Sequence, residues 1–234
     1  MSLVIDYYQQ LVDLPAAQNT CSLIGLPKLA SYWPAIMAIA VFFQVLRLSS
    51  NTLSSCLFGK KFDVLTPRQK YDWGVRVVSQ VHAVSVVILS VPILFKEELI
   101  KDPLYGFDAY SAWVYSIKPS LQYYGASFIM FETSTIFLNI NWWMDKLGLT
   151  GSRLQFYNAS ALLFLYLTIR IMFGTYMSYH MFEDLKAKGS QTPAVLYYFY
   201  RIANHSILVL SYYWFYLMIN AVRKRFQPAK TKAD

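Results

Sequence analysis

The sequence predicts an all-α, polytopic membrane protein, a helix bundle with about five transmembrane helices. Hydrophobic residues make up 56% of the chain and charged residues only 15%, with a mean hydropathy of +0.33. Five separate apolar runs are each long enough to cross a bilayer, because about 20 apolar residues in a helix span roughly 30 Å of hydrocarbon. A soluble domain of this size would carry more charge, and 234 residues leave no room for a second folded domain outside the membrane.

The five apolar runs follow one another with short polar segments between them. The expected spans cover residues 29–48, 75–95, 121–140, 154–179 and 202–222. Residues 106–117 are rich in aromatic side chains but too short and polar for a span, so they are expected at the lumenal interface. Asp6 and Asp13 interrupt the first twenty residues, which excludes a cleaved signal peptide there and makes the first span an uncleaved signal anchor.

The basic residues predict the orientation of these spans. The net charge is +8, and Lys and Arg gather in alternate loops and in the tail, as expected of cytosolic segments. This places the N-terminus in the lumen and the C-terminus in the cytosol. Nucleic-acid binding explains the charge less well, because the basic residues flank spans and form no separate domain. Cys21 and Cys56 then lie on opposite sides of the membrane and are expected to be unpaired thiols.

The C-terminal tail has the form of an address signal. Lys230 and Lys232 lie five and three positions from the carboxyl end, the pattern of a dilysine-type retrieval signal. On a cytosolic tail this pattern predicts the endoplasmic reticulum membrane. The alternative is a solvated terminus that simply follows the positive-inside rule.

Three ionisable side chains lie well inside the expected spans: His82, Glu132 and Arg170. His82 and Glu132 are expected at similar depths of roughly 10–12 Å from the cytosolic side, and Arg170 at about 24 Å, nearer the lumen. A charge at such a depth is costly unless it is paired or faces a polar cavity. These residues are therefore the first candidates for a functional site.

Each of the three has a structural alternative. His82 can be a neutral imidazole that is hydrogen-bonded to a neighbouring helix. Glu132 needs a proton or a donor such as His82, Arg170 or the hydroxyls of residues 133–135. Arg170 cannot lose its charge and must face protein, water or a lipid headgroup. Together they predict a polar interior or lipid-binding cleft, with a purely structural network as the alternative.

Three stretches of this sequence resemble a known family. They are YDWGVRVVSQVHA (Tyr71 to Ala83), FETSTIFLNINWWMDKLG (Phe131 to Gly148) and LYLTIRIMFGTYMSY (Leu165 to Tyr179). They are similar to the TLC domain, which is shared by ceramide synthases, TRAM-type translocon proteins and CLN-type lipid-homeostasis proteins. The resemblance covers about Asp72 to Arg223 and is closest to members that are not ceramide synthases.

The resemblance adds two candidates to the site. Arg76 matches a family position in the opening span, as do Trp73 and His82, and Asn139 lies in the most specific stretch, 132–142. It also implies a division of the chain into a lumenal segment, a first span with a cytosolic loop, a TLC-like domain and a basic tail. Their expected ranges are 1–28, 29–70, 71–223 and 224–234.

The sequence departs from the family at the centre of this domain. The family carries roughly two further spans, with acidic and His motifs, where this chain passes directly from Ile117 to Lys118. The sequence therefore predicts an incomplete TLC-type bundle with an internal deletion near 117–118. An alternative transcript or a gene model that lacks an exon would produce it.

These observations favour a lipid-binding or lipid-homeostasis protein over an enzyme. Ceramide synthases owe acyl transfer to a His pair in the missing region, whereas His82, His180 and His205 lie on different elements. No metal-ligand cluster, catalytic triad or phosphate loop is present, so no metal or cofactor is predicted. The alternative is a ceramide-synthase-like acyltransferase or its inactive remnant. A transporter is less favoured because no internal repeat or paired broken helices are evident. The expected partners are membrane lipids, and oligomerisation stays open.

Overall fold

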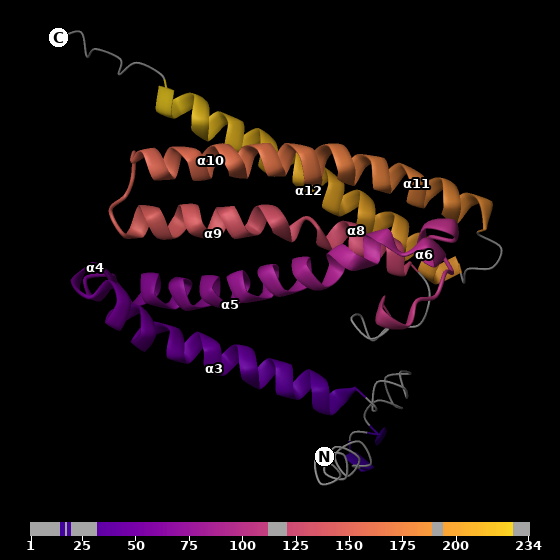
Figure 1. Cartoon of the computed structure of the whole chain (residues 1–234), viewed down its shortest axis with the longest axis horizontal. Helices are drawn as coiled ribbons and strands as arrows, with labels where there is room; N and C mark the ends of the chain where they lie inside the picture. The colour runs from indigo at the N-terminus through magenta and orange to yellow at the C-terminus, as the bar shows by residue number, and fades with distance from the viewer. Residues whose placement is uncertain (1–14, 17, 20–31, 112–120, 189–193, 227–234) are drawn as a thin grey trace. The chain divides into compact units, whose positions relative to one another are not determined.

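The computed structural model describes residues 15–16, 18–19, 32–111, 121–188 and 194–226 (Figure 1). Regular structure in these residues is helical throughout. The helices with their bounds are α3 (Trp33–Phe58), α4 (Lys60–Asp63), α5 (Pro67–Ser90), the 3₁₀-helix η2 (Val91–Phe95), α6 (Glu97–Lys101), α8 (Gln122–Ile129), α9 (Glu132–Lys146), α10 (Arg153–Leu165), the π-helix η3 (Tyr166–Phe173), α11 (Gly174–Ala187) and α12 (Ala194–Phe226). They form two compact units, Met1–Val78 and Ser79–Asp234.

Four of the described helical segments are long and apolar enough to cross a membrane. They are Trp33–Phe58, Pro67–Phe95, Arg153–Ala187 and Tyr197–Arg223. They correspond to the first, second, fourth and fifth expected spans, and they confirm the predicted all-α membrane fold.

The third expected span, 121–140, is not one helix, and this prediction of an unbroken span is wrong. α8 ends at Ile129, and α9 begins at Glu132 and continues past the expected end to Lys146. At the join the backbone N–H of Phe131 donates to the Phe128 carbonyl oxygen at 3.1 Å, a tighter i to i−3 bond than the α-helix uses. The two helices lie end to end (Figure 1).

The first unit is a helical hairpin in which α4 joins α3 to the beginning of α5. Trp73 is buried, its indole N–H donates to Ser54 Oγ at 2.8 Å, and the Phe62 ring meets it edge-on with centroids 5.2 Å apart. A Cβ atom at Gly74 would lie 3.0 Å from the Arg47 carbonyl oxygen, so glycine permits α3 and α5 to approach closely here.

In the second unit α9 and α10 form an antiparallel pair joined by a short turn. Gly148 and Gly151 have φ angles of +75° and +81°, which favour glycine. Ser152 caps α10 by accepting from the Gln155 backbone N–H, and the Gln155 side-chain amide donates to Asp145 Oδ1 at 2.6 Å. These bonds fix the turn and the pairing of the two helices.

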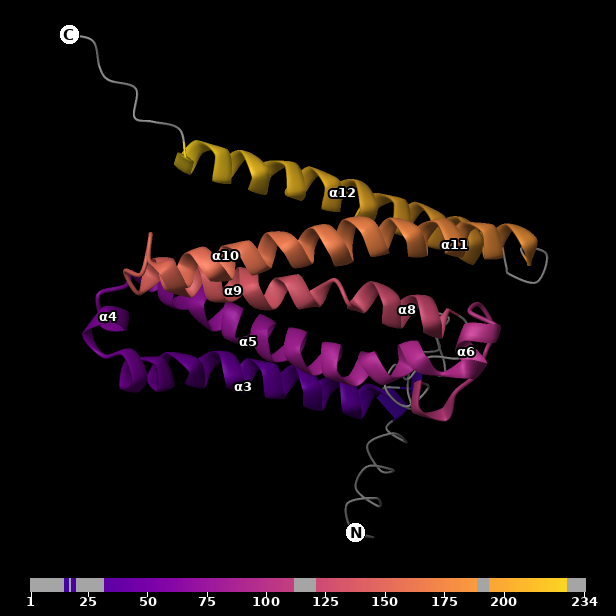
Figure 2. The same ribbon diagram turned by 45° about the horizontal axis from the view of Figure 1, so that its top comes forward.

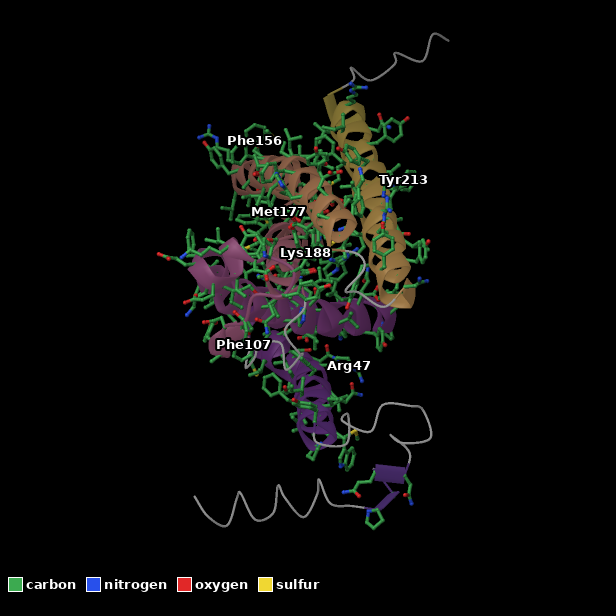
Figure 3. The ribbon with its side chains drawn as sticks, turned by 90° about the vertical axis from the view of Figure 1, so that its right-hand side faces the viewer. Arg47, Phe107, Phe156, Met177, Lys188 and Tyr213 are labelled. Atoms are coloured by element: carbon green, nitrogen blue, oxygen red, sulfur yellow. The ribbon has the colours of Figure 1, made fainter. Side chains whose placement is uncertain are left out.

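α10, η3 and α11 continue one another as a single long rod, and α12 packs along its η3 and α11 parts (Figure 2). Tyr124 of α8 packs with Met177, Met181 and Leu185 of α11 in an apolar cluster of this unit. Figure 3 shows Met177 among the helices, and it shows Tyr213 pointing outward from α12. Large apolar side chains exposed in this way are expected of helices that face lipid.

The helix termini of the second unit gather at two ends. The α9–α10 turn and the C-terminal end of α12 share one end, and α6 and the end of α11 share the other (Figures 1 and 2). At the latter end Lys96 pairs with Asp108 at 3.1 Å and Lys188 with Asp102 at 2.6 Å. Which of these two ends faces the cytosol stays a prediction.

Several predictions fall on residues outside the described ranges. These are the retrieval lysines Lys230 and Lys232, the junction at 117–118 and Cys21. Cys56 is described and is an exposed free thiol.

Candidate functional site

Arg170 lies in η3, inside an expected span, and its guanidinium is hydrogen-bonded to α9 and to the turn before it. Its Nε donates to the Phe131 carbonyl oxygen at 3.2 Å and to Ser134 Oγ at 2.9 Å, and Nη2 donates to Thr135 Oγ1 at 3.2 Å. The rings of Phe131 and Tyr166 flank it, with centroids 5.5 and 5.2 Å from Cζ. The charge therefore faces neighbouring protein rather than acyl chains.

The Phe131 carbonyl oxygen is the point where three groups converge. It accepts bonds from Arg170, from the Ser134 backbone N–H at 3.3 Å and from the Ser134 hydroxyl at 2.9 Å. Phe131 and Ser134 are both buried. In hydrocarbon each backbone carbonyl must find a donor within the protein, so Arg170 supplies part of what the interrupted α8–α9 ladder lacks.

Two irregular backbone segments therefore meet at Arg170: the π-helix η3 and the break between α8 and α9. A Cβ atom at Gly174, directly after η3, would lie 2.6 Å from Cζ of the Phe131 ring. Glycine at this position lets the ring enter between the helices and brings the carbonyl within reach of Arg170. Irregular helical turns of this kind are frequent at functional sites.

Glu132 occupies the first turn of α9, where the helix dipole favours a carboxylate. Its side chain is half-buried. In the part of the chain that the structure describes, it has no hydrogen bond or ion pair. The Ser134 hydroxyl, one of the expected donors, donates to the Phe131 carbonyl oxygen instead, and the Thr135 hydroxyl accepts from Arg170. The carboxylate therefore keeps its capacity to accept from a donor outside the described protein.

The remaining predicted site residues lie apart from this pair. Asn139 is buried further along α9, and its amide donates to Ser79 Oγ at 3.2 Å and Gln80 Oε1 at 3.3 Å, both on α5. His82 is exposed on α5. Arg76 is half-buried and belongs to the first unit. The structure thus places Arg170 and Glu132 near one junction, and it gives Asn139 a separate contact with α5.

Comparison with known proteins decides the family. A family model of the TLC domain matches residues 104–220, half of this chain. The chain belongs to the TLC-domain family. The matched residues of the TLC domain include Glu132, Asn139 and Arg170. Arg76 and His82 precede the matched residues.

One curated relative is an uncharacterized TLC domain-containing protein of Schizosaccharomyces pombe. It is 26% identical over 248 residues, which cover 90% of this chain and 85% of the relative. The aligned length exceeds the 234 residues of this TLC-domain protein, so the alignment opens gaps in this chain. No solved structure matches.

Three cavities lie within the second unit of this TLC-domain protein. The first lies between α10 and α12 near the α9–α10 turn and has a volume of about 290 Å³. The second adjoins it, includes Leu138 and Asn141 of α9, and has a volume of about 160 Å³. The third lies between α8, α11 and α12 and has a volume of about 270 Å³. None of the three is lined by the five predicted site residues. The linings of these three cavities are mostly apolar, whereas the Arg170 junction is polar.

The histidines of this TLC-domain protein lie on three helices. His180 of α11 packs against the Tyr176 ring with centroids 4.4 Å apart, and His205 of α12 stacks on Phe182 at 5.5 Å. Across the described ranges no three His, Cys, Asp or Glu side chains are arranged to hold a metal ion.

Sequence reasoning missed two polar groups at the α8 end of the bundle. The Tyr124 hydroxyl donates to Asp184 Oδ2 at 2.5 Å, and Asn204 of α12 is buried. Asn204 lies within the fifth expected span, and an intramembrane amide is itself a signal that could have marked it. Asp184 could not have been found in this way, because it lies beyond the end of the fourth expected span.

Proposed function

We propose that this TLC-domain protein is a multi-pass protein of the endoplasmic reticulum membrane that binds lipids without transforming them and thereby contributes to lipid homeostasis. The observation that supports this proposal is the junction at Arg170, where a permanently charged group is held within a span by two irregular helices. Such an arrangement is costly to maintain in hydrocarbon, and headgroup recognition gives it a purpose. The location rests on the tail lysines.

The junction offers a headgroup two different contacts. Arg170 uses Nε and Nη2 for protein bonds, which leaves donor capacity on its guanidinium, since an arginine carries five N–H groups. Glu132, next to Phe131 in the chain, offers acceptor oxygens that the described protein does not use. A zwitterionic or hydroxylated headgroup would satisfy both, and apolar helix faces would take its chains.

A ceramide-synthase-like acyltransferase is the second candidate, because the family includes such enzymes. Its chemistry needs a general base in the site. Arg170 cannot serve as one, and the ring packing of His180 and His205 on separate helices gives no pair to share a proton. His82 remains the residue on which this alternative depends.

The test uses cells that lack the protein and express either the native chain or Arg170→Leu, with Lys186→Ala, an exposed cation of α11, as the control. We expect the native chain and the control to restore the phospholipid and sphingolipid profile and Arg170→Leu to fail at equal protein level. The purified native chain should not turn over a sphingoid base with acyl-CoA. Turnover that His82→Ala abolishes would establish the enzyme instead.

A further inference from the structure

The cavity between α8, α11 and α12 has the features of a second lipid site. Its volume is about 270 Å³. Its lining includes Tyr124, Gly125, Phe128, Met181, Asn204 and Ile207. Ile207 is 47% exposed at its rim, on the surface of α12 that would face the membrane. A chain from the bilayer can therefore reach the cavity without crossing water.

Asn204 is the unusual member of this lining. Its side chain is only 7% exposed, and Oδ1 has no hydrogen-bond partner among the described residues. Buried polar atoms are nearly always paired in native proteins, so each unpaired one needs an explanation. Asn204 also opens the sequon Asn204-His205-Ser206, and its burial withdraws the amide from glycosylation. A bound molecule that carries a hydrogen-bond donor would supply the missing bond.

The rest of the lining restricts the chemistry of that partner. None of the described residues that line the cavity is cationic, which disfavours a phosphate or carboxylate group. The Tyr124 hydroxyl is already committed to Asp184, whose carboxylate also disfavours an anion nearby. What the cavity offers is an apolar surface and one unpaired acceptor.

We propose that this cavity binds a neutral lipid, with its hydrocarbon chain against α8, α11 and α12 and a hydroxyl or amide N–H donated to the Asn204 side chain. The occupant is a lipid monomer such as a diacylglycerol or a ceramide, which share this chemistry. The site is separate from the Arg170 junction, since Arg170 and its hydrogen-bond partners are absent from the lining, and it does not depend on the function proposed above.

The test is photolabelling of the full chain in membranes with a clickable diazirine diacylglycerol and with its O-methyl ether, which lacks the donor. We expect the native chain to prefer the free hydroxyl by about 2- to 10-fold, the range that one neutral hydrogen bond supports. The preference should fall to about 1-fold in Asn204→Leu. Competition by unlabelled diacylglycerol and by unlabelled ceramide then tells which lipid the cavity prefers.

Two further variants keep the test decisive if Asn204→Leu fails to fold. Gly125 lines the cavity and a Cβ atom there meets nothing within 4 Å, so the side chain of Gly125→Leu should occupy the cavity and abolish labelling. Asn141→Leu, which changes another unpaired asparagine in a different cavity, should leave the preference intact. Equal labelling by both probes, an unchanged preference in Asn204→Leu, or undiminished labelling of Gly125→Leu would overturn the proposal.

Discussion

At the residue scale, Arg170 shows how a charge is tolerated within a span. Sequence alone predicted that it must face protein, water or a headgroup, because it cannot be neutralised. It did not predict the partners: the hydroxyls of Ser134 and Thr135 were expected as donors to Glu132, and in the structure both accept hydrogen bonds from Arg170. Which of two polar neighbours a hydroxyl serves depends on helix rotation, which the sequence pattern leaves open.

Replacing Arg170 with leucine should destabilise the protein by about 1–3 kcal/mol, because several intramembrane hydrogen bonds are lost and the Phe131 carbonyl loses one of its donors. Arg170→Lys should recover only part of this, since an ammonium cannot reproduce the planar fork. The measurement is the unfolding midpoint in detergent. The control Lys186→Ala should stay within about 0.5 kcal/mol of the native chain. An Arg170→Leu protein as stable as that control would show that the hydrogen bonds of Arg170 do not stabilise the folded protein.

The ion pair between Asp102 and Lys188 predicts a pH dependence. The Lys188 ammonium holds the pKa of Asp102 below 3.8, and the bond to Asp102 raises the pKa of Lys188 above 10.5. The stabilisation that the Asp102 carboxylate gives the folded protein is therefore present above pH 3.8 and is lost as the pH falls through the folded-state pKa of Asp102. The stabilisation from the Lys188 ammonium is lost only as the pH rises above 10.5.

Asp102→Asn should accordingly lower the unfolding midpoint at neutral pH, and its difference from the native chain should shrink in acid below pH 3.8. Both side chains are about 40% exposed, so added salt should weaken the effect. Glu97→Gln, which removes a far more exposed pair with Lys101, serves as the control and should change little. A difference that persists unchanged in strong acid would assign the effect of Asp102 to packing.

At the element scale, apolar pattern and length located four of the five expected spans, because long periodic segments depend little on tertiary context. The same reasoning missed the break in 121–140 and the π-helix. Both depend on contacts between helices, above all on the contact between the Phe131 ring and Gly174. A hydropathy pattern does not predict such contacts. The structure instead divides the expected span 121–140 between α8 and α9.

Gly174→Ala tests this account of the junction. Its added methyl group would meet the buried Phe131 ring, and we expect a loss of about 1–3 kcal/mol of stability. Gly125→Ala is the matched control, because its Cβ enters open space and alanine is the better helix former by up to about 1 kcal/mol. Equal unfolding midpoints for the two variants would show that packing of the Phe131 ring does not require a glycine at position 174.

At the scale of the whole molecule, the family and the membrane fold could be predicted from the sequence as a whole. The location in the endoplasmic reticulum and the orientation in the membrane are predicted only from short patterns of charged residues.

We expect the native chain to stay in the endoplasmic reticulum and a chain with both Lys230→Ser and Lys232→Ser to move beyond it, as followed by fluorescence microscopy with organelle markers. Lys224→Ser with Arg225→Ser, a change of equal charge in the same tail, controls for topology. Retention of the double lysine variant would show that the two lysines are not needed.

The central claim is that this TLC-domain bundle holds lipid without converting it, and native mass spectrometry of the full chain released from mild detergent tests it most directly. We predict that defined lipid adducts survive on the native chain, that Arg170→Leu loses the species with polar headgroups at equal folded fraction, and that incubation with a sphingoid base and acyl-CoA leaves the adduct masses unchanged. A native chain that carries no lipid, or new masses that match an N-acylated product, would contradict the account.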